Sequence, residues 1–219
     1  MKKTLIKGAA LAVFGAALTT GCAWATPMLS LSDGATTVTV TDGAGSDILD
    51  GVIVFNGAVG GWIVNVSTGM SPVPGSIALP HMDLSSTNVF VDPTSLLSKT
   101  LTIKLSDTVT PSSGITGAAT HVGGANNNTT AAFDVYYGGS LMDSLGSFSN
   151  TAYSGESAFP YSGGTTSIDL VATLTALGSS GNASFNYELT PVPEPTTMLL
   201  LGTGLVGLAG IGRKRMKKA

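Results

Sequence analysis

Cysteine, histidine and charged residues are scarce in this chain of 219 residues. It holds one cysteine, Cys22, and two histidines, and only 11% of its residues are charged. Cys22 falls inside the N-terminal export signal described below, so the mature body would have neither a disulfide nor a thiol nucleophile. Two histidines cannot make a three-histidine zinc site. Burial of apolar side chains must therefore stabilise the body, and a domain of about 165 residues can be stable without disulfides or structural metals.

Positive charge is almost absent from the middle of the chain. Of the ten Lys and Arg residues, eight lie in the first seven or the last seven positions. Residues 26–195 hold the other two together with all thirteen acids, a balance of −11 that the whole-chain charge of −3 conceals. Such a body repels nucleic acid and anionic lipid, so we predict no nucleic-acid partner. Solubility outside the cell explains the acids, and attraction of divalent cations or basic partners is the alternative.

The N-terminus has the three parts of a secretory signal. A basic start, MKKTLIK, precedes the apolar run GAALAVFGAAL and the small-residue exit Ala23-Trp24-Ala25. We expect signal peptidase to recognise Ala23 and Ala25 and to cleave after Ala25. A lipoprotein site at Cys22 is the alternative, but Thr19 occupies the position where that pattern expects leucine. A permanent N-terminal anchor is disfavoured because the apolar run is short for a membrane span.

The C-terminus combines prolines, an apolar segment and a basic cluster. Val192-Pro193-Glu194-Pro195 precedes residues 196–212, which are apolar and just long enough for a helix to span a membrane. The cations that follow are Arg213, Lys214, Arg215, Lys217 and Lys218. The positive-inside rule places this cluster in the cytoplasm and the acidic body outside the inner membrane, in agreement with the export signal.

These C-terminal residues together resemble the PEP-CTERM sorting tail of Gram-negative bacteria. The resemblance implies that an exosortase, a membrane cysteine protease, recognises the tail around Pro193-Glu194-Pro195 and removes the helix. The body would then pass from the inner membrane to the cell surface or the extracellular matrix. Proteins with such tails typically accompany exopolysaccharide production and biofilm formation. An ordinary tail anchor explains the helix and the charges but leaves the Pro-Glu-Pro motif unexplained.

The region between the two ends has an all-β pattern of short segments divided by Gly, Asn, Asp, Ser and Pro clusters. Residues 37–41, TVTVT, alternate with the period of a strand whose valines face the core. We predict further strands at residues 52–55, 62–66, 89–91, 101–105, 131–136, 167–174 and 184–189. The expected fold is a single antiparallel β-sandwich, with an open barrel as the alternative. The organisation is a signal peptide at 1–25, the β-domain at 26–190 and the sorting tail at 191–219.

Three connections in the body are predicted as loops. Residues 72–80 hold three prolines, and residues 123–130 are polar and rich in asparagine. Residues 178–182 are expected to turn the last hairpin. Binding sites in such folds commonly lie on loops, so residues 72–80 and 123–130 are candidate ligand surfaces.

Residues 43–50, GAGSDILD, resemble part of one calcium-binding nonapeptide of repeats-in-toxin proteins. If calcium binds there, Asp42, Asp47 and Asp50 are the expected ligands. A single copy without a nine-residue period is equally explained by an acidic turn, and Asp42 stands where that pattern expects glycine. We therefore expect no obligatory cofactor and retain calcium as the alternative.

Other chemistry has little support in the sequence. No Gly-x-Ser-x-Gly elbow accompanies His81 or His121, so a secreted hydrolase is the least favoured of three hypotheses. Aromatic residues that could stack on sugars are more commonly used in a core. These residues are Trp62, Tyr136, Tyr137, Tyr153, Phe159 and Tyr161. The threonines at 37, 39 and 41 invite an ice-binding interpretation, which requires many repeated copies that are not present.

The favoured hypothesis is a non-enzymatic surface or matrix protein, with no catalytic residues, that associates with exopolysaccharide after exosortase processing. A carbohydrate-binding or calcium-binding module delivered by the same route is the second hypothesis.

Overall fold

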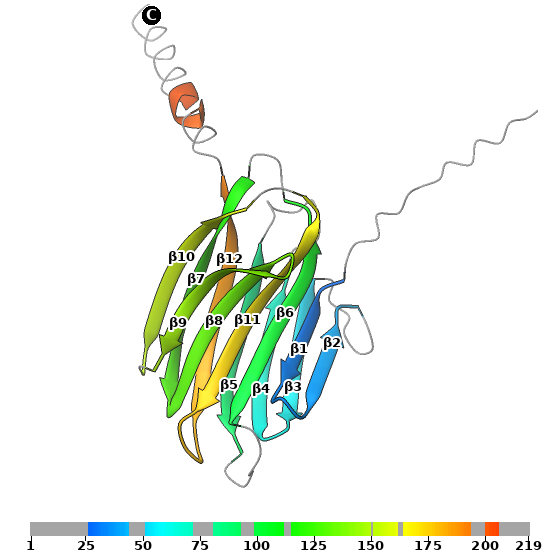
Figure 1. Cartoon of the computed structure of the whole chain (residues 1–219), viewed down its shortest axis with the longest axis vertical. Coiled ribbons are helices and arrows are strands. Elements are labelled where there is room, and N and C mark those ends of the chain that lie inside the picture. The colour runs from blue at the N-terminus through cyan, green and yellow to red at the C-terminus, as the bar shows by residue number, and fades with distance from the viewer. Residues whose placement is uncertain are drawn as a thin grey trace, which may run out of the picture.

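The structure, a computed structural model, consists mainly of antiparallel strands (Figure 1). The structure describes residues 26–43, 51–71, 81–92, 99–111, 115–149, 151–161, 164–193 and 200–205. The strands are β1 Met28–Ser32, β2 Thr37–Thr41, β3 Val52–Val59, β4 Trp62–Met70, β5 Met82–Val91, β6 Thr100–Val109, β7 Ile115–Asn127, β8 Thr129–Tyr137, β9 Ser140–Phe148, β10 Tyr153–Pro160, β11 Thr166–Ala176 and β12 Asn182–Pro193.

Two six-stranded sheets form the sandwich. Sheet A has the order β2-β1-β6-β11-β8-β9, and sheet B has the order β10-β7-β12-β5-β4-β3. All the neighbouring pairs are antiparallel (Figure 1). Of the two predicted architectures, the β-sandwich is therefore the one observed.

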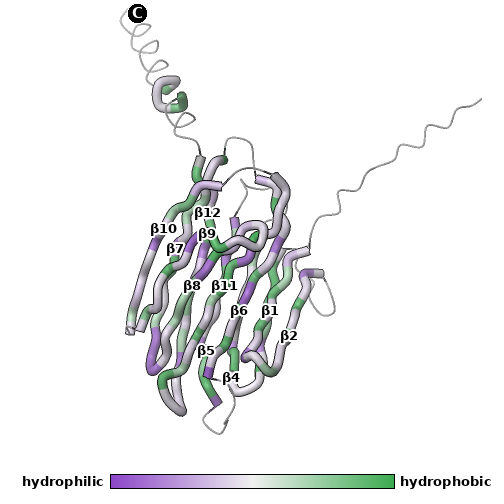
Figure 2. Tube along the Cα trace, viewed as in Figure 1, coloured by the Kyte–Doolittle hydropathy of each residue, from purple (hydrophilic) through white to green (hydrophobic). Residues whose placement is uncertain are grey.

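The alternation of apolar and polar residues explains why these strands stack in two layers. Along β11, for example, Ile168, Leu170, Ala172 and Leu174 are buried, and the residues between them are more exposed. Hydropathy changes along the strands of the Cα trace (Figure 2). Because successive side chains of a strand point to opposite faces, this pattern gives each sheet one apolar face. The apolar faces of the two sheets pack against each other, which removes both faces from water.

Phe133 of β8 lies at the centre of an aromatic cluster between the sheets. The centroid of its ring lies 5.3 Å from the ring centroid of Phe185 and 5.2 Å from that of Tyr187, both on β12. The rings of Phe148 and Tyr153 lie 6.1 Å and 6.0 Å from it. These contacts join strands of both sheets, and Trp62, also fully buried, extends the same core.

The eight predicted strands all occur, each lengthened at one or both ends except 37–41, which coincides with β2. Four further strands, β1, β7, β9 and β10, were not predicted. Residues 115–127 of β7, ITGAATHVGGANN, hold few of the β-branched and aromatic residues that mark strands. Pairing with β12 on one side and β10 on the other forms this strand despite its composition.

The prediction of a polar connection at 123–130 was wrong. Residues 123–127 continue β7, and β8 begins at Thr129, so only Asn128 lies between the strands. Asn128 has a φ of 50°, a conformation that asparagine adopts more readily than most residues. The chain passes there from sheet B to sheet A, and the Asn128 carbonyl accepts the Leu177 N–H at 2.8 Å.

Residues 178–182 do not turn a hairpin either. β11 lies in sheet A and β12 in sheet B, so the connection between them crosses from one sheet to the other. The period-two pattern of the two strands is the same whether they form a hairpin in one sheet or lie in different sheets. The pattern therefore could not exclude the hairpin that we predicted. Residues 72–80, the other predicted loop, lie outside the described residues.

Phe133→Ala should lower the free energy of unfolding by about 3–5 kcal/mol, because it removes a fully buried ring that contacts four others. Urea unfolding followed by circular dichroism measures this change. Leu141→Ala on β9, whose side chain is 54% exposed, is the matched control and should shift stability by less than about 0.5 kcal/mol. Equal losses in the two variants would contradict the placement of Phe133.

Candidate functional site

The C-terminal motif begins inside the folded domain. β12 runs to Pro193, and Pro191, Val192 and Pro193 pair with Ala118, Gly117 and Ile115 of β7. Glu194 and Pro195 lie outside the described residues, as do Arg213, Lys214, Arg215, Lys217 and Lys218. The first two residues of Val192-Pro193-Glu194-Pro195 are thus part of sheet B, which the motif alone could not reveal.

The prolines lie beyond the part of β12 that pairs with two described strands. Pairing with β5 ends at Leu189, which lies opposite Met82, whereas pairing with β7 continues to Pro193. Proline has no N–H, so a strand tolerates it only where a ladder hydrogen bond is not needed on both sides. Among the described residues, Pro191 and Pro193 pair with β7 alone, which gives both prolines a permitted place.

The predicted membrane helix is described in part. Residues 200–205 are helical, and Leu200, Leu201 and Leu205 are exposed by 75%, 60% and 59%. Within the described ranges, no helix has both the length and the apolar character that a membrane crossing requires. The signal peptide, with Ala23 and Ala25, lies outside the described residues.

One of the three predicted calcium ligands is described. The Oδ2 atom of Asp42 accepts the Gly51 N–H at 2.9 Å. Its Oδ1 atom is buried and has no hydrogen-bond partner among the described residues. Asp47 and Asp50 lie outside those residues, so the calcium site stays a prediction.

The fold brings Asp107 of β6 into the neighbourhood of Asp42. Burial, together with the charge of Asp42, raises the pKa of the Asp107 carboxyl above its ordinary value. The Ser71 hydroxyl and the Thr108 N–H, which donate hydrogen bonds to this carboxylate, act in the opposite direction. No local pattern indicates this acidic pair, because 64 residues separate Asp42 and Asp107 along the chain.

Both histidines lie in one row of ionisable side chains on the outer face of sheet B. Glu156 of β10, His121 of β7, Glu188 of β12 and Asp83 of β5 are successive cross-strand partners. His81, which precedes β5, places Nε2 3.4 Å from Oε1 of Glu188. His121 places Nδ1 3.8 Å from Oε2 of Glu156. Sequence analysis named these residues separately, and only the strand register makes them neighbours.

The row does not form a metal centre in the part of the chain that the structure describes, where no three His, Cys, Asp or Glu side chains are close enough to hold an ion. One acid of the row, Asp83, has a shifted pKa. Burial, and next the charge of Glu188, raise the pKa of the Asp83 carboxyl, whereas His81 acts in the opposite direction.

The outer face of sheet A carries hydroxyl groups from several strands. Thr37, Ser32, Thr102 and Thr173 are successive cross-strand partners on β2, β1, β6 and β11. The Ser32 and Thr37 hydroxyl oxygens lie 2.8 Å apart. The threonine strand noted in the sequence is therefore the edge of a wider hydroxyl-bearing face.

Most of the candidate aromatic residues belong to the core. Trp62, Tyr153, Phe159 and Tyr161 are at most 9% exposed. Tyr137 is partly exposed and stacks on Tyr161 with ring centroids 5.4 Å apart. Burial removes the four from consideration as an open sugar platform.

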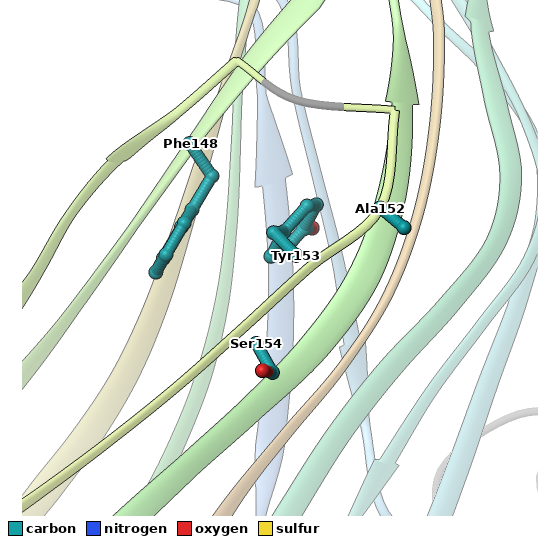
Figure 3. A pocket seen from close by; sticks show the side chains of 4 residues that line it. All are labelled: Phe148, Ala152, Tyr153 and Ser154. Carbon is teal, nitrogen blue, oxygen red and sulfur yellow. The ribbon is translucent and has the colours of Figure 1, made fainter.

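Phe148, which the sequence analysis did not single out, lies at a surface hollow. Figure 3 shows Phe148 and Tyr153 side by side, with Ala152 and Ser154 completing the lining. The hollow lies where β9, the edge of sheet A, meets β10, the edge of sheet B. The Phe148 and Tyr153 rings are stacked, with centroids 4.7 Å apart and an angle of 14°.

Asn126 hydrogen-bonds to the backbone at this hollow. Its side-chain amide donates to the Phe148 carbonyl at 2.8 Å, and its backbone N–H donates to the Thr151 carbonyl at 3.2 Å. Asn126 is only 3% exposed, and its Oδ1 atom has no partner among the described residues. One buried residue of β7 thus hydrogen-bonds to Phe148 at the end of β9 and to Thr151 just before β10.

Comparison with known proteins identifies the C-terminus. Residues 191–215 match the model of the PEP-CTERM protein-sorting motif. This match confirms the resemblance drawn from Val192-Pro193-Glu194-Pro195 and the residues after it. No curated protein matches the chain.

Several solved structures are distantly similar. The PA14 sugar-binding domain from an RTX adhesin has a TM-score of 0.37 and 14% identity, and the match covers 78% of this chain and 94% of that one. TmCBM61 in complex with β-1,4-galactotriose has a TM-score of 0.36 and 16% identity, with 64% and 88% covered. At this distance the similarities assign no function.

Asp83→Asn should stabilise the protein at neutral pH by up to about 1 kcal/mol. The raised pKa means that the folded protein holds this proton more tightly than the unfolded chain. The contribution of Asp83 to stability is therefore fully present below its ordinary pKa of 3.8 and is lost as the pH rises through the folded-state value. Urea unfolding at several pH values measures the difference between variant and wild type, which should disappear in acid.

A Glu188→Gln background provides the control, because it removes the neighbouring charge that contributes to the shift. In that background the gain from Asp83→Asn should be smaller. A gain of the same size at every pH would rule out titration of Asp83 as its cause.

Proposed function

Since the chain carries the PEP-CTERM protein-sorting motif at residues 191–215, we propose that it is an exported structural protein that an exosortase delivers to the cell surface or extracellular matrix. In this proposal the protein is non-enzymatic and associates with exopolysaccharide in a Gram-negative bacterium. The motif carries the proposal, because it implies an exosortase as processing partner, export, and transient anchoring in the membrane.

The properties of the body are compatible with this role. Residues 26–195 have a balance of −11, which favours solubility outside the cell. The sandwich closes around an apolar core and needs no disulfide, since the sole cysteine lies in the predicted signal. The hydroxyl-bearing outer face of sheet A supplies donors and acceptors of the kind that hydrated polysaccharides bind.

We expect the mature protein to lack both ends of the chain. Intact-mass measurement of fractionated cells should find a species that begins near Thr26, has lost the apolar tail and is absent from the inner membrane. Glu194→Ala, or loss of the exosortase, should instead leave a species with the complete tail in the inner-membrane fraction. Retention of the tail by the wild type would refute the proposed sorting.

The hollow at Phe148 favours a second candidate function, the binding of a neutral saccharide. Apolar faces of sugar rings pack on aromatic rings, and binding sites generally combine an apolar lining with a few polar groups. Phe148 is partly exposed, and Ser154, which carries a hydroxyl group, is one of the lining residues. The lining residues Phe148, Ala152, Tyr153 and Ser154 are all uncharged, which suits an uncharged ligand in an otherwise acidic body.

Ala152→Arg should block this hollow without disturbing the core, because Ala152 is exposed and lines the hollow. Calorimetric titration with neutral oligosaccharides prepared from the exopolysaccharide should show affinity at least about tenfold lower than that of the wild type, or roughly 1.4 kcal/mol. Ala158→Arg, at an exposed position farther along β10, is the matched control and should bind as the wild type does. Equal binding by Ala152→Arg would exclude the hollow as the site.

A further inference from the structure

The strands on one side of the sandwich carry no ionisable residue. β1, β2, β3 and β4 contain no acid, lysine, arginine or histidine, whereas each of the other eight strands contains at least one. β2, the edge of sheet A, and β3, the edge of sheet B, lie against each other on this side, and β9 and β10 form the opposite side (Figure 1). Among the described strands, the negative charge of the body is therefore concentrated away from the side formed by β2 and β3.

The four edge strands differ in the features that prevent pairing with another chain. An edge strand presents unpaired backbone N–H and C=O groups, and proteins protect such edges with charge, proline or short length. β10 contains Glu156 and Pro160, β9 contains Asp143, and β2 has only five residues. β3 has eight residues and contains neither charge nor proline. β3 is thus the least protected of the four edges.

The irregular pairing between β3 and β4 leaves β3 itself regular. Phe55 lies opposite Ser67, and two residues later Gly57 lies opposite Val64. Two residues of β4 consequently lie opposite the one residue of β3 between them, Asn56. The extra residue of a bulge bends the strand that contains it, and here that strand is β4, on the inner side of the edge.

Exposed apolar side chains lie beside the free edge of β3. Val54 of β3 is 52% exposed, and Met70 of β4 is 45% exposed. Met70 lies opposite Val52, so Val54 and Met70 are diagonal neighbours on the outer face of sheet B. Ala58, farther along β3, is also exposed. The edge thus combines unpaired backbone groups with apolar side chains that a neighbouring strand would cover.

A second copy of this chain is the partner that fits the edge of β3. Only another strand supplies alternating backbone donors and acceptors along a whole edge. Two bodies that each have a balance of −11 repel one another, and the side formed by β2 and β3 lets them approach without bringing carboxylates of facing strands together. The carboxylates of Asp33 and Asp42, which flank β2, accept backbone N–H groups of their own chain.

We infer that two copies of this protein associate by antiparallel pairing of their β3 strands, which joins their B sheets into one continuous sheet. A two-fold axis relates the copies, so that the same edge serves as both halves of the interface. Val54 and Met70 of each copy are then covered in part by the other, and the uncharged β2 strands lie beside the junction. This association goes beyond the proposed function and requires neither tail removal nor saccharide binding.

Val54→Asp should weaken the pairing, because it places like charges on strands that face one another across the two-fold axis. Analytical ultracentrifugation of the full-length protein in detergent should show a dimer for the wild type. The dissociation constant of the variant should be at least about tenfold higher. Ala158→Asp, at an exposed position on β10 at the opposite side, adds the same charge and should dimerise as the wild type does.

A wild type that stays monomeric would overturn the inference. Equal dimerisation by Val54→Asp and the wild type would also overturn it, and this is the result expected if copies associate through their apolar tails. Circular dichroism should show the same strand content in both variants, since both positions are exposed.

Cross-linking tests the same pairing without disturbing it. Cys22→Ser removes the one cysteine of the chain. In that background Asn56→Cys, near the middle of β3, places the two thiols close to the two-fold axis, where a short bismaleimide can join them. Thiols held in one complex react at a raised effective concentration, so Ala158→Cys on β10 should give at least about tenfold less covalent dimer. Equal yields from the two positions would contradict pairing through β3.

Discussion

The whole structure depends on burial of one face of each sheet against the other. Alternation of apolar and polar residues gives strands such as β11 an inner side, and the aromatic cluster around Phe133 lies between the two sheets. With no disulfide available to the body, this packing is the main source of stability. Residues of β8, β9, β10 and β12 meet at the Phe133 ring, so strands from the two sheets depend on the same contact.

The same packing holds the strand that leads into the sorting motif. β12 contributes Phe185 and Tyr187 to the core and then continues without interruption to Pro193. The sorting motif is consequently attached to a central strand and not to a peripheral loop. A strand between two neighbours is among the hardest parts of a sheet to detach.

Strand register, and not proximity in the sequence, assembles the polar surfaces. His121 and Glu188 lie 67 positions apart, yet they are direct partners on β7 and β12. Thr37 of β2 likewise lies in one row with Ser32, Thr102 and Thr173 of three other strands. Since side chains alternate between faces with a period of two, a row across the sheet collects every residue that shares a face and a register position.

The sequence by itself determined the all-β class, eight of the strands and the sorting motif, because alternation and a proline-plus-cation tail are local patterns. It misplaced residues 123–130 and 178–182, where turn-forming residues mark a change of sheet or a continuing strand and not the expected loop and hairpin. Gly- and Ala-rich β7 is a strand only because β10 and β12 pair with it, and that pairing is a tertiary property. The hollow at Phe148, the row that contains both histidines and the end of β12 inside the motif were likewise decided by the fold, since each depends on which strands become neighbours.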